Sequence, residues 1–170
     1  MLAFPGQGSQ YVDMGKILMS RSSRAREIFQ RANEVLKLDL SEIAKDEKTL
    51  TRTENAQPAI LTHSIAAMEA FREEHDDEFH VDTCVGHSLG EFTALVASGC
   101  LSLEDGVRLV RGRGEAMASA SNESQKMMAL MPTKYNEELK SIIYDVNSED
   151  GGVCDIANVN SKNQVVLSGM

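Results

Sequence analysis

Positive charge is scarce in this chain of 170 residues, in which 17 Lys and Arg residues stand against 26 Asp and Glu residues. The formal net charge of -9 repels phosphate backbones at long range, so we expect no nucleic-acid partner. Cysteine is scarce too, since Cys84, Cys100 and Cys154 are odd in number and far apart in sequence. This spacing is typical of buried thiols in a reducing compartment, and it predicts neither a disulfide framework nor a metal site.

Long apolar runs are also missing. No stretch approaches the roughly 18 residues that a membrane-spanning helix needs, and the first residues lack the pattern of a secretory signal. We therefore expect no membrane partner, and a location in the cytoplasm, or in the mitochondrial matrix if a transit peptide has been removed. The contents of 42% hydrophobic and 25% charged residues are typical of a globular protein with one sizeable core.

Short apolar strands alternate with helical patterns in the first part of the chain. The predicted elements are a strand at 2–4, helices at 24–36 and 58–71, and a strand at 84–85 that stops at 86–90. A helix that starts at once and runs through 92–97 follows, and then a helix at 104–120. Pro58 is expected in the first turn of its helix, where a missing N–H is tolerated. This alternation is typical of a parallel sheet covered by helices, and therefore of an α/β fold.

The pattern changes after residue 124. A strand at 127–131, a helix at 135–144 and strands at 153–159 and 164–167 give the order β-α-β-β. One further helix and strand would complete a ferredoxin-like unit. We therefore interpret the chain as the N-terminal portion of a longer protein.

The sharpest motif is Gly86-His87-Ser88-Leu89-Gly90, a G-x-S-x-G pentapeptide with a strand before it and a helix after it. This context predicts a nucleophile elbow, which lifts the hydroxyl of Ser88 above the edge of the sheet. The N–H of Leu89, at the start of the helix, is then a natural donor to an oxyanion. The alternative is a chance turn in which a serine caps a helix, and the flanking strand makes the elbow the better interpretation.

None of the four histidines is a convincing general base for Ser88. His87 is adjacent in sequence, but neighbouring residues of such a turn point in different directions, and a base must reach within about 3 Å of the hydroxyl. We expect His87 to pack or to orient the site. His63 is predicted as a satisfied interior histidine, and His75 and His80 as solvated ones.

Two further residues are candidates for binding. Gln7, between Gly6 and Gly8, follows the first strand and so places an amide where α/β sheets bind ligands. The loop lacks the third glycine of a dinucleotide fingerprint, and plain loop glycines are the alternative. Arg113 is flanked by two glycines that cost helix stability. These glycines predict room for a ligand or a close backbone, the alternative being an ordinary surface arginine.

Taken together, these stretches resemble the malonyl-CoA:acyl carrier protein transacylase family over essentially the whole chain. The matching stretches are Phe4 to Gln10, Gln57-Pro58-Ala59, Gly86 to Glu91, Val107 to Val110 with Arg113-Gly114, and Asn158 to Gly169. The resemblance implies that Ser88 is the acyl-bearing nucleophile and that Arg113 grips the malonyl carboxylate. It also implies an oxyanion hole formed by Gln7 and the Leu89 backbone, and a site lined by His87, Asn158 and Asn160.

The resemblance further implies an α/β-hydrolase-like parallel-sheet subdomain at residues 1–124 that carries the elbow. Residues 125–170 would form the first part of an inserted ferredoxin-like subdomain that is incomplete in this chain. The implied reaction is malonyl transfer from malonyl-CoA to acyl carrier protein by a monomer, with no cofactor and no metal, in fatty acid synthesis. The family's base histidine lies downstream of the region matching Asn158 to Gly169. The alternatives are a serine hydrolase or thioesterase, and a catalytically silent N-terminal fragment that lacks this histidine.

Overall fold

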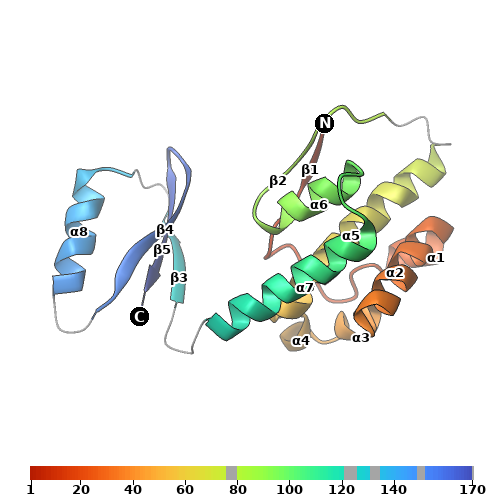
Figure 1. Ribbon diagram of the computed structural model, residues 1–170, viewed down its shortest axis with the longest axis horizontal. Coiled ribbons are helices and arrows are strands. Elements are labelled where there is room, and N and C mark those ends of the chain that lie inside the picture. The colour runs from red at the N-terminus through yellow and green to blue at the C-terminus, as the bar shows by residue number, and fades with distance from the viewer. Residues whose placement is uncertain (76–79, 121–125, 131–134, 149–151, 170) are drawn as a thin grey trace. The chain divides into compact units, whose positions relative to one another are not determined.

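The computed structural model describes residues 1–75, 80–120, 126–130, 135–148 and 152–169. They divide into two compact units, residues 1–120 and 121–170, and each is described by itself (Figure 1). The domain boundary predicted at residues 124 and 125 lies outside the described residues. No helix in the described ranges is long and apolar enough to cross a membrane.

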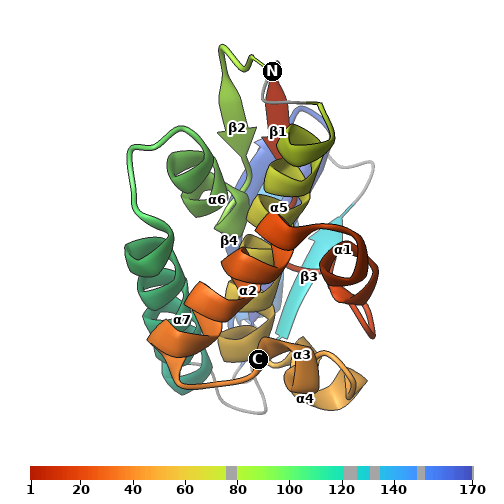
Figure 2. The same cartoon turned by 90° about the vertical axis from the view of Figure 1, so that its right-hand side faces the viewer.

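The first unit is a two-stranded parallel sheet surrounded by helices. Its elements are β1 (Leu2–Phe4), α1 (Lys16–Arg21), α2 (Ser23–Leu36), α3 (Leu40–Ile43), α4 (Glu47–Thr51), α5 (Thr53–Glu74), β2 (Cys84–Gly86), α6 (Leu89–Ala97) and α7 (Leu103–Ala120). Strands β1 and β2 pair in parallel, with Ala3 opposite Val85. Helix α6 packs against both strands, and α2 and α7 pack against α5 (Figures 1 and 2). The predicted parallel sheet and its covering helices are confirmed.

Helix α5 is the centre of the hydrophobic core. Its middle residues are apolar on nearly every side, and Ile60 and Leu61 are 1% and 0% exposed. Val107 and Val110 of α7 and Phe29 of α2 are buried in the same cluster. A helix that is apolar almost all round is typical of a buried element, and its neighbours are amphipathic helices that cover it.

Pro58 lies in the interior of α5 rather than in its first turn, because the helix begins at Thr53. The predicted position of this proline is therefore wrong. A proline has no N–H to donate to the carbonyl four residues earlier, which here belongs to Glu54. Arg111 of α7 donates to that carbonyl oxygen instead, at 2.9 Å, and also to Asn55 Oδ1 at 2.6 Å. A neighbouring helix thus satisfies the acceptor that Pro58 leaves unpaired.

Helix α7 approaches the first turn of α5 at Gly114. A Cβ atom on Gly114 would lie 2.5 Å from Glu54 Cα and 2.8 Å from the Thr53 carbonyl oxygen. At Gly112, on the other side of Arg113, such a Cβ would meet no heavy atom of the described residues within 4 Å beyond its chain neighbours and its own helix backbone. The prediction of a close backbone is confirmed for Gly114 alone, and Gly112 borders open space.

The second unit is a three-stranded antiparallel sheet with one helix. Its elements are β3 (Lys126–Leu130), α8 (Glu137–Ser148), β4 (Cys154–Ser161) and β5 (Gln164–Gly169). The strand order is β3-β5-β4, and α8 packs against β4. Asn147 fastens α8 to β4, because its side chain both accepts from the Cys154 N–H and donates to the Cys154 carbonyl. The predicted β-α-β-β order is confirmed, and the last predicted residue of the first strand, Met131, lies outside the described residues.

The three cysteines are free, as predicted. Cys84 and Cys154 are half-buried, but Cys100 is exposed in the turn between α6 and α7. The prediction of buried thiols is therefore wrong for Cys100.

The two glycines beside Arg113 give a matched pair of stability variants. Gly114→Ala should lower the free energy of unfolding by about 1–3 kcal/mol, because the new methyl group overlaps the α5 backbone. Gly112→Ala should instead raise it by roughly 0.5–1 kcal/mol, since alanine favours a helix and meets nothing there. Urea unfolding of both variants beside the parent protein measures the difference. Equal effects at the two positions would show that the α5–α7 approach is not tight.

Candidate active site around Ser88

Ser88 occupies the turn between β2, which ends at Gly86, and α6, which begins at Leu89. Its backbone angles are φ 54° and ψ -107°, in a region that residues with a side chain rarely adopt. Such a conformation costs on the order of 1–3 kcal/mol and is found mainly at functional sites. The turn therefore has the strained geometry of a nucleophile elbow.

Two glycines and one carboxylate hold this turn. A Cβ atom on Gly86 would lie 2.0 Å from the Gly90 carbonyl carbon, and one on Gly90 would lie 2.4 Å from the Phe4 carbonyl oxygen. The carboxylate of Glu91 accepts a hydrogen bond from the Ser88 N–H at 2.9 Å. The turn is thus pressed against the end of β1, and no larger residue fits at either glycine.

The first turn of α6 presents a free donor. The Leu89 side chain is fully buried, which anchors the start of the helix in the core. Within the described ranges, the Leu89 N–H donates to no acceptor of the protein. A first-turn N–H at a helix N-terminus suits a developing negative charge, as predicted from the motif.

Arg113 reaches the serine from α7. Its NH2 group donates to Ser88 Oγ at 2.9 Å, and its NH1 group donates to Gln57 Oε1 at 2.7 Å. The guanidinium carbon also lies 5.8 Å from the centre of the Phe92 ring, within the range of a cation–π interaction. Arg113 is therefore half-buried and held on three sides, and the alternative of an ordinary surface arginine is wrong.

Gln57 and Thr53 belong to the same cluster, although the motif analysis assigned them no role. Gln57 is fully buried, and its Nε2 donates to Thr53 Oγ1 at 2.8 Å and contacts Met117 Sδ at 3.5 Å. The Thr53 hydroxyl donates to Gln7 Oε1 at 2.9 Å. A glutamine within the mostly apolar stretch 56–61 is the sequence signal that could have pointed to them, because a buried amide needs partners.

The Gln7 loop lies against the elbow. A Cβ atom on Gly6 would lie 3.0 Å from the His87 carbonyl oxygen, so that the two turns are in direct contact. The loop is also held from within, since the Gly8 N–H donates to Gln10 Oε1 and the Ser9 hydroxyl donates to the Gly6 carbonyl. Gln7, Ser88 and Arg113 are thus brought together from three separate elements.

The histidines do not supply a base. His87 is exposed, and its carbonyl oxygen accepts from the Gly90 N–H. Ser88 Oγ accepts a hydrogen bond from Arg113, and no hydrogen bond among the described residues joins it to a histidine. His63 Nε2 lies 3.5 Å from the Tyr11 hydroxyl, while the buried Nδ1 has no hydrogen-bond partner among the described residues. The expected satisfied histidine is therefore found at one nitrogen only. Burial lowers the pKa of His63.

Asn158 and Asn160 lie on β4 of the second unit. Asn158 is opposite Val166 of β5, and Asn160 Nδ2 donates to Gln164 Oε1 at 2.9 Å. Both are exposed, and their role in the site stays a prediction.

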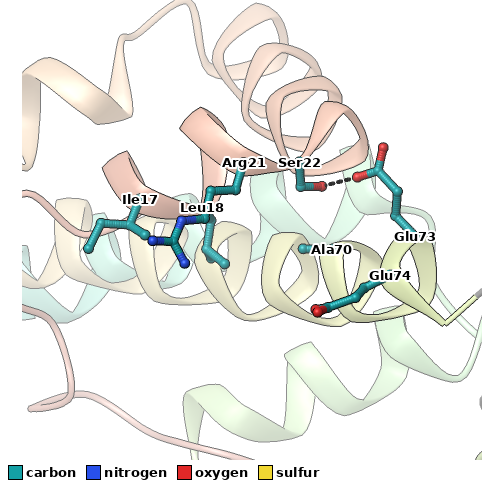
Figure 3. Close-up of a pocket in the computed structure, with 7 residues that line it drawn as sticks. All are labelled: Ile17, Leu18, Arg21, Ser22, Ala70, Glu73 and Glu74. Atoms are coloured by element: carbon teal, nitrogen blue, oxygen red, sulfur yellow. Dashed lines mark hydrogen bonds between the residues drawn. The ribbon is translucent and has the colours of Figure 1, made fainter.

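A separate hollow of about 500 Å³ lies between α1 and α5 (Figure 3). In its polar wall, the Glu73 carboxylate accepts from the hydroxyls of Ser22 and Ser23 at the start of α2. The Ser22 hydrogen bond and then the Ser23 one lower the pKa of Glu73 to about 2. These contacts fasten one helix to another and offer no chemistry. No group of three His, Cys, Asp or Glu side chains in the described ranges could hold a metal ion.

Known proteins are similar to this chain in sequence and fold. The sequence pattern described as the acyl transferase domain matches residues 2–170. The malonyl CoA-acyl carrier protein transacylase of Bacillus subtilis strain 168 is 44% identical over 168 residues, which are 98% of this chain and 52% of that protein.

Solved structures of malonyltransferases are also similar to this chain. An acyl-carrier-protein-S-malonyltransferase from Bartonella henselae has a TM-score of 0.85 and 38% identity over 99% of this chain and 54% of its own. A malonyl-transacylase solved in complex with a type II PKS acyl-carrier protein has a TM-score of 0.83 and 32% identity, over the same shares of the two chains. The chain spans about half the length of the relatives it matches. It belongs to the acyl transferase domain family.

Proposed function

We propose that the protein containing this chain transfers a malonyl group from malonyl-CoA to the phosphopantetheine thiol of acyl carrier protein, in fatty acid synthesis. The observation that carries the proposal is the 2.9 Å contact between the Arg113 guanidinium and Ser88 Oγ. It puts a permanent cation beside a serine in the strained geometry of a nucleophile. The names of the relatives, and the neighbour solved with an acyl-carrier protein, support the same substrates.

Acyl transfer would proceed in two halves. Ser88 Oγ attacks the thioester carbonyl of malonyl-CoA, the C–S bond breaks, and coenzyme A leaves as the thiol with the proton that Ser88 gave up. The thiol of acyl carrier protein then attacks the Ser88 ester, and the serine recovers its proton. By the family resemblance, the histidine that carries this proton lies beyond Met170. The Leu89 N–H and Gln7 would stabilise the oxyanion in both halves.

Arg113 accounts for the choice of a malonyl group. An acyl chain of three carbons on Ser88 Oγ has its free carboxylate within reach of the guanidinium 2.9 Å from that oxygen. Arginine stays charged at any working pH, and its planar fork can bind both carboxylate oxygens. A serine hydrolase acting on neutral esters shares the elbow but has no need of this cation.

Several finer features belong to the same proposal. The second unit would be the first part of a ferredoxin-like subdomain, because β3-α8-β4-β5 follows the order of such a unit and the first strand pairs with the third. The first unit would be α/β-hydrolase-like, with the elbow between strand and helix. We propose a monomer that needs no cofactor or metal, works in the cytoplasm, and has Asn158, Asn160 and His87 in its substrate site.

Labelling by substrate tests the nucleophile. Malonyl-CoA should add one malonyl group to the full-length protein at Ser88, and Ser88→Ala should abolish both labelling and transfer, because no other nucleophile occupies the elbow. Intact mass before and after incubation, followed by peptide mapping, measures it. Labelling of Ser88→Ala at the parental rate would exclude the elbow serine.

Substrate preference tests the cation. Arg113→Ala leaves a malonyl carboxylate desolvated and unpaired, a loss of about 2–5 kcal/mol, or roughly 30- to several-thousand-fold in kcat/KM for malonyl-CoA. Acetyl-CoA has no such carboxylate. The loss in kcat/KM for acetyl-CoA should therefore be at least about tenfold smaller than the loss for malonyl-CoA. Arg113→Lys should recover part of the loss, since an ammonium keeps the charge but not the fork.

Arg108, exposed on the same helix and paired with Asp105, provides the matched control, and Arg108→Ala should change neither substrate's kcat/KM. Equal losses for malonyl- and acetyl-CoA in Arg113→Ala would mean that Arg113 supports the fold or the CoA moiety. A thioesterase or a general acyltransferase would then be the better assignment.

A further inference from the structure

Glu91 holds both peptide groups of Ser88. The Ser88 N–H donates to Glu91 Oε1 at 2.9 Å, and the Glu91 N–H donates to the Ser88 carbonyl oxygen at 3.2 Å. Glu91 is the third residue of α6, and its side chain is exposed. Because φ and ψ describe how these two peptide groups are turned about Ser88, fixing both of them fixes the backbone conformation of the serine.

The conformation of Ser88 needs such support. Its φ of 54° and ψ of -107° are unfavourable for a residue with a Cβ atom, and they persist only where several contacts impose them. Gly86 and Gly90 leave room for the turn, but room alone does not hold the serine in it. A hydrogen bond from the Ser88 N–H to a carboxylate is a directed contact of the stronger, charge-assisted kind.

Glu91 also decides which backbone donor of the turn stays free. The N–H groups of Ser88 and Leu89 both lack an intrahelical acceptor, as at the start of any helix. The Glu91 carboxylate takes the first, while the second has no acceptor among the described residues. The Ser88 carbonyl and the Leu89 N–H belong to one planar trans peptide and point in opposite directions. The Glu91 N–H, by holding that carbonyl, therefore fixes the direction of the Leu89 N–H.

We infer that the Glu91 carboxylate is a positioning group for acyl transfer, which holds Ser88 in the strained conformation that aims its Oγ and the Leu89 N–H at the same acyl carbonyl. The inference rests on the proposed function, in which Ser88 attacks a thioester. Glu91 acts through the backbone of Ser88 and not on the substrate. Without the carboxylate, the Ser88 N–H loses its acceptor and the turn relaxes, so that the nucleophile and the oxyanion donor no longer act on one carbonyl.

The test uses single-turnover acylation of the full-length protein by malonyl-CoA. Glu91→Ala removes the acceptor and should lower the maximal acylation rate about tenfold, the effect of losing one hydrogen bond to a charged group. The malonyl-CoA concentration that gives half of this rate should change little, since Arg113 binds the carboxylate. Glu91→Gln keeps an amide oxygen as acceptor and should stay within about threefold of the parental rate. Equal losses in Glu91→Gln and Glu91→Ala would overturn the inference.

A second substrate separates this role from an effect on Arg113. Acetyl-CoA meets the same serine and the same Leu89 N–H, so Glu91→Ala should slow acylation by acetyl- and malonyl-CoA by the same factor, within about twofold. Arg113→Ala, by contrast, is expected to affect the two substrates unequally. A loss in Glu91→Ala that is confined to malonyl-CoA would contradict the inference. If the parent protein itself fails to acylate Ser88, the proposed function fails instead, and the two failures are distinguishable.

Asp105 provides the matched control, because it is likewise the third residue of a helix, α7, and its exposed carboxylate accepts from the Ser102 hydroxyl at 2.8 Å. Asp105→Ala should leave acylation unchanged, and a loss as large as that of Glu91→Ala would show that loosening any helix start is enough. Should Glu91→Ala not fold, Glu91→Met keeps an unbranched side chain that favours a helix but has no carboxylate. It should show the same loss of about tenfold, and a parental rate in either Glu91 variant would overturn the inference.

Discussion

The hydrogen bond from the Arg113 guanidinium to Ser88 Oγ is the contact on which the rest of the site depends. It joins the middle of α7 to the turn between β2 and α6, two parts of the chain separated by 25 residues. The contact requires Gly114, which lets α7 approach α5, and the glycines of the elbow, which let the serine stand clear of the sheet. The fold's close approaches therefore converge on one pair of side chains, Arg113 and Ser88. In the proposed function, this pair would distinguish an acyltransferase for charged acyl groups from an ordinary serine hydrolase.

The first half of α5 is the structural support for this pair. It carries buried polar residues, Asn55 and Gln57 among them, in a helix that is otherwise part of the core. Two arginines of α7 donate hydrogen bonds to these residues. Arg111 donates to Asn55 and to the carbonyl oxygen that Pro58 leaves unpaired. Arg113 donates to Gln57. Buried polar groups of this kind are costly unless every member is paired, so the network fixes how the two helices lie together.

The sequence was enough to predict the parts that depend on local pattern. The strands at β1 and β2 and the turn around Ser88 follow from short motifs and glycine spacing. The role of Arg113 was implied by the family resemblance and stays a prediction. The prediction that Pro58 lies in the first turn of its helix was wrong. The carbonyl oxygen that Pro58 leaves unpaired accepts a hydrogen bond from Arg111, a residue far away in the chain. Thr53 and Gln57 were given no role for the same reason, since their partners come from two other elements. The short helices α3 and α4 were missed, although the Asp39 and Asp46 side chains that cap them are visible in the sequence.

The most direct test of the account is the crystal structure of the full-length protein with a malonyl group on Ser88. The free carboxylate is expected about 2.7–2.9 Å from the Arg113 guanidinium nitrogens, in the distance range of charge-assisted hydrogen bonds. The carbonyl oxygen of the malonyl ester is expected beside the Leu89 N–H. A carboxylate directed to solvent or to another cation, with Arg113 still bound to the serine oxygen, would contradict it.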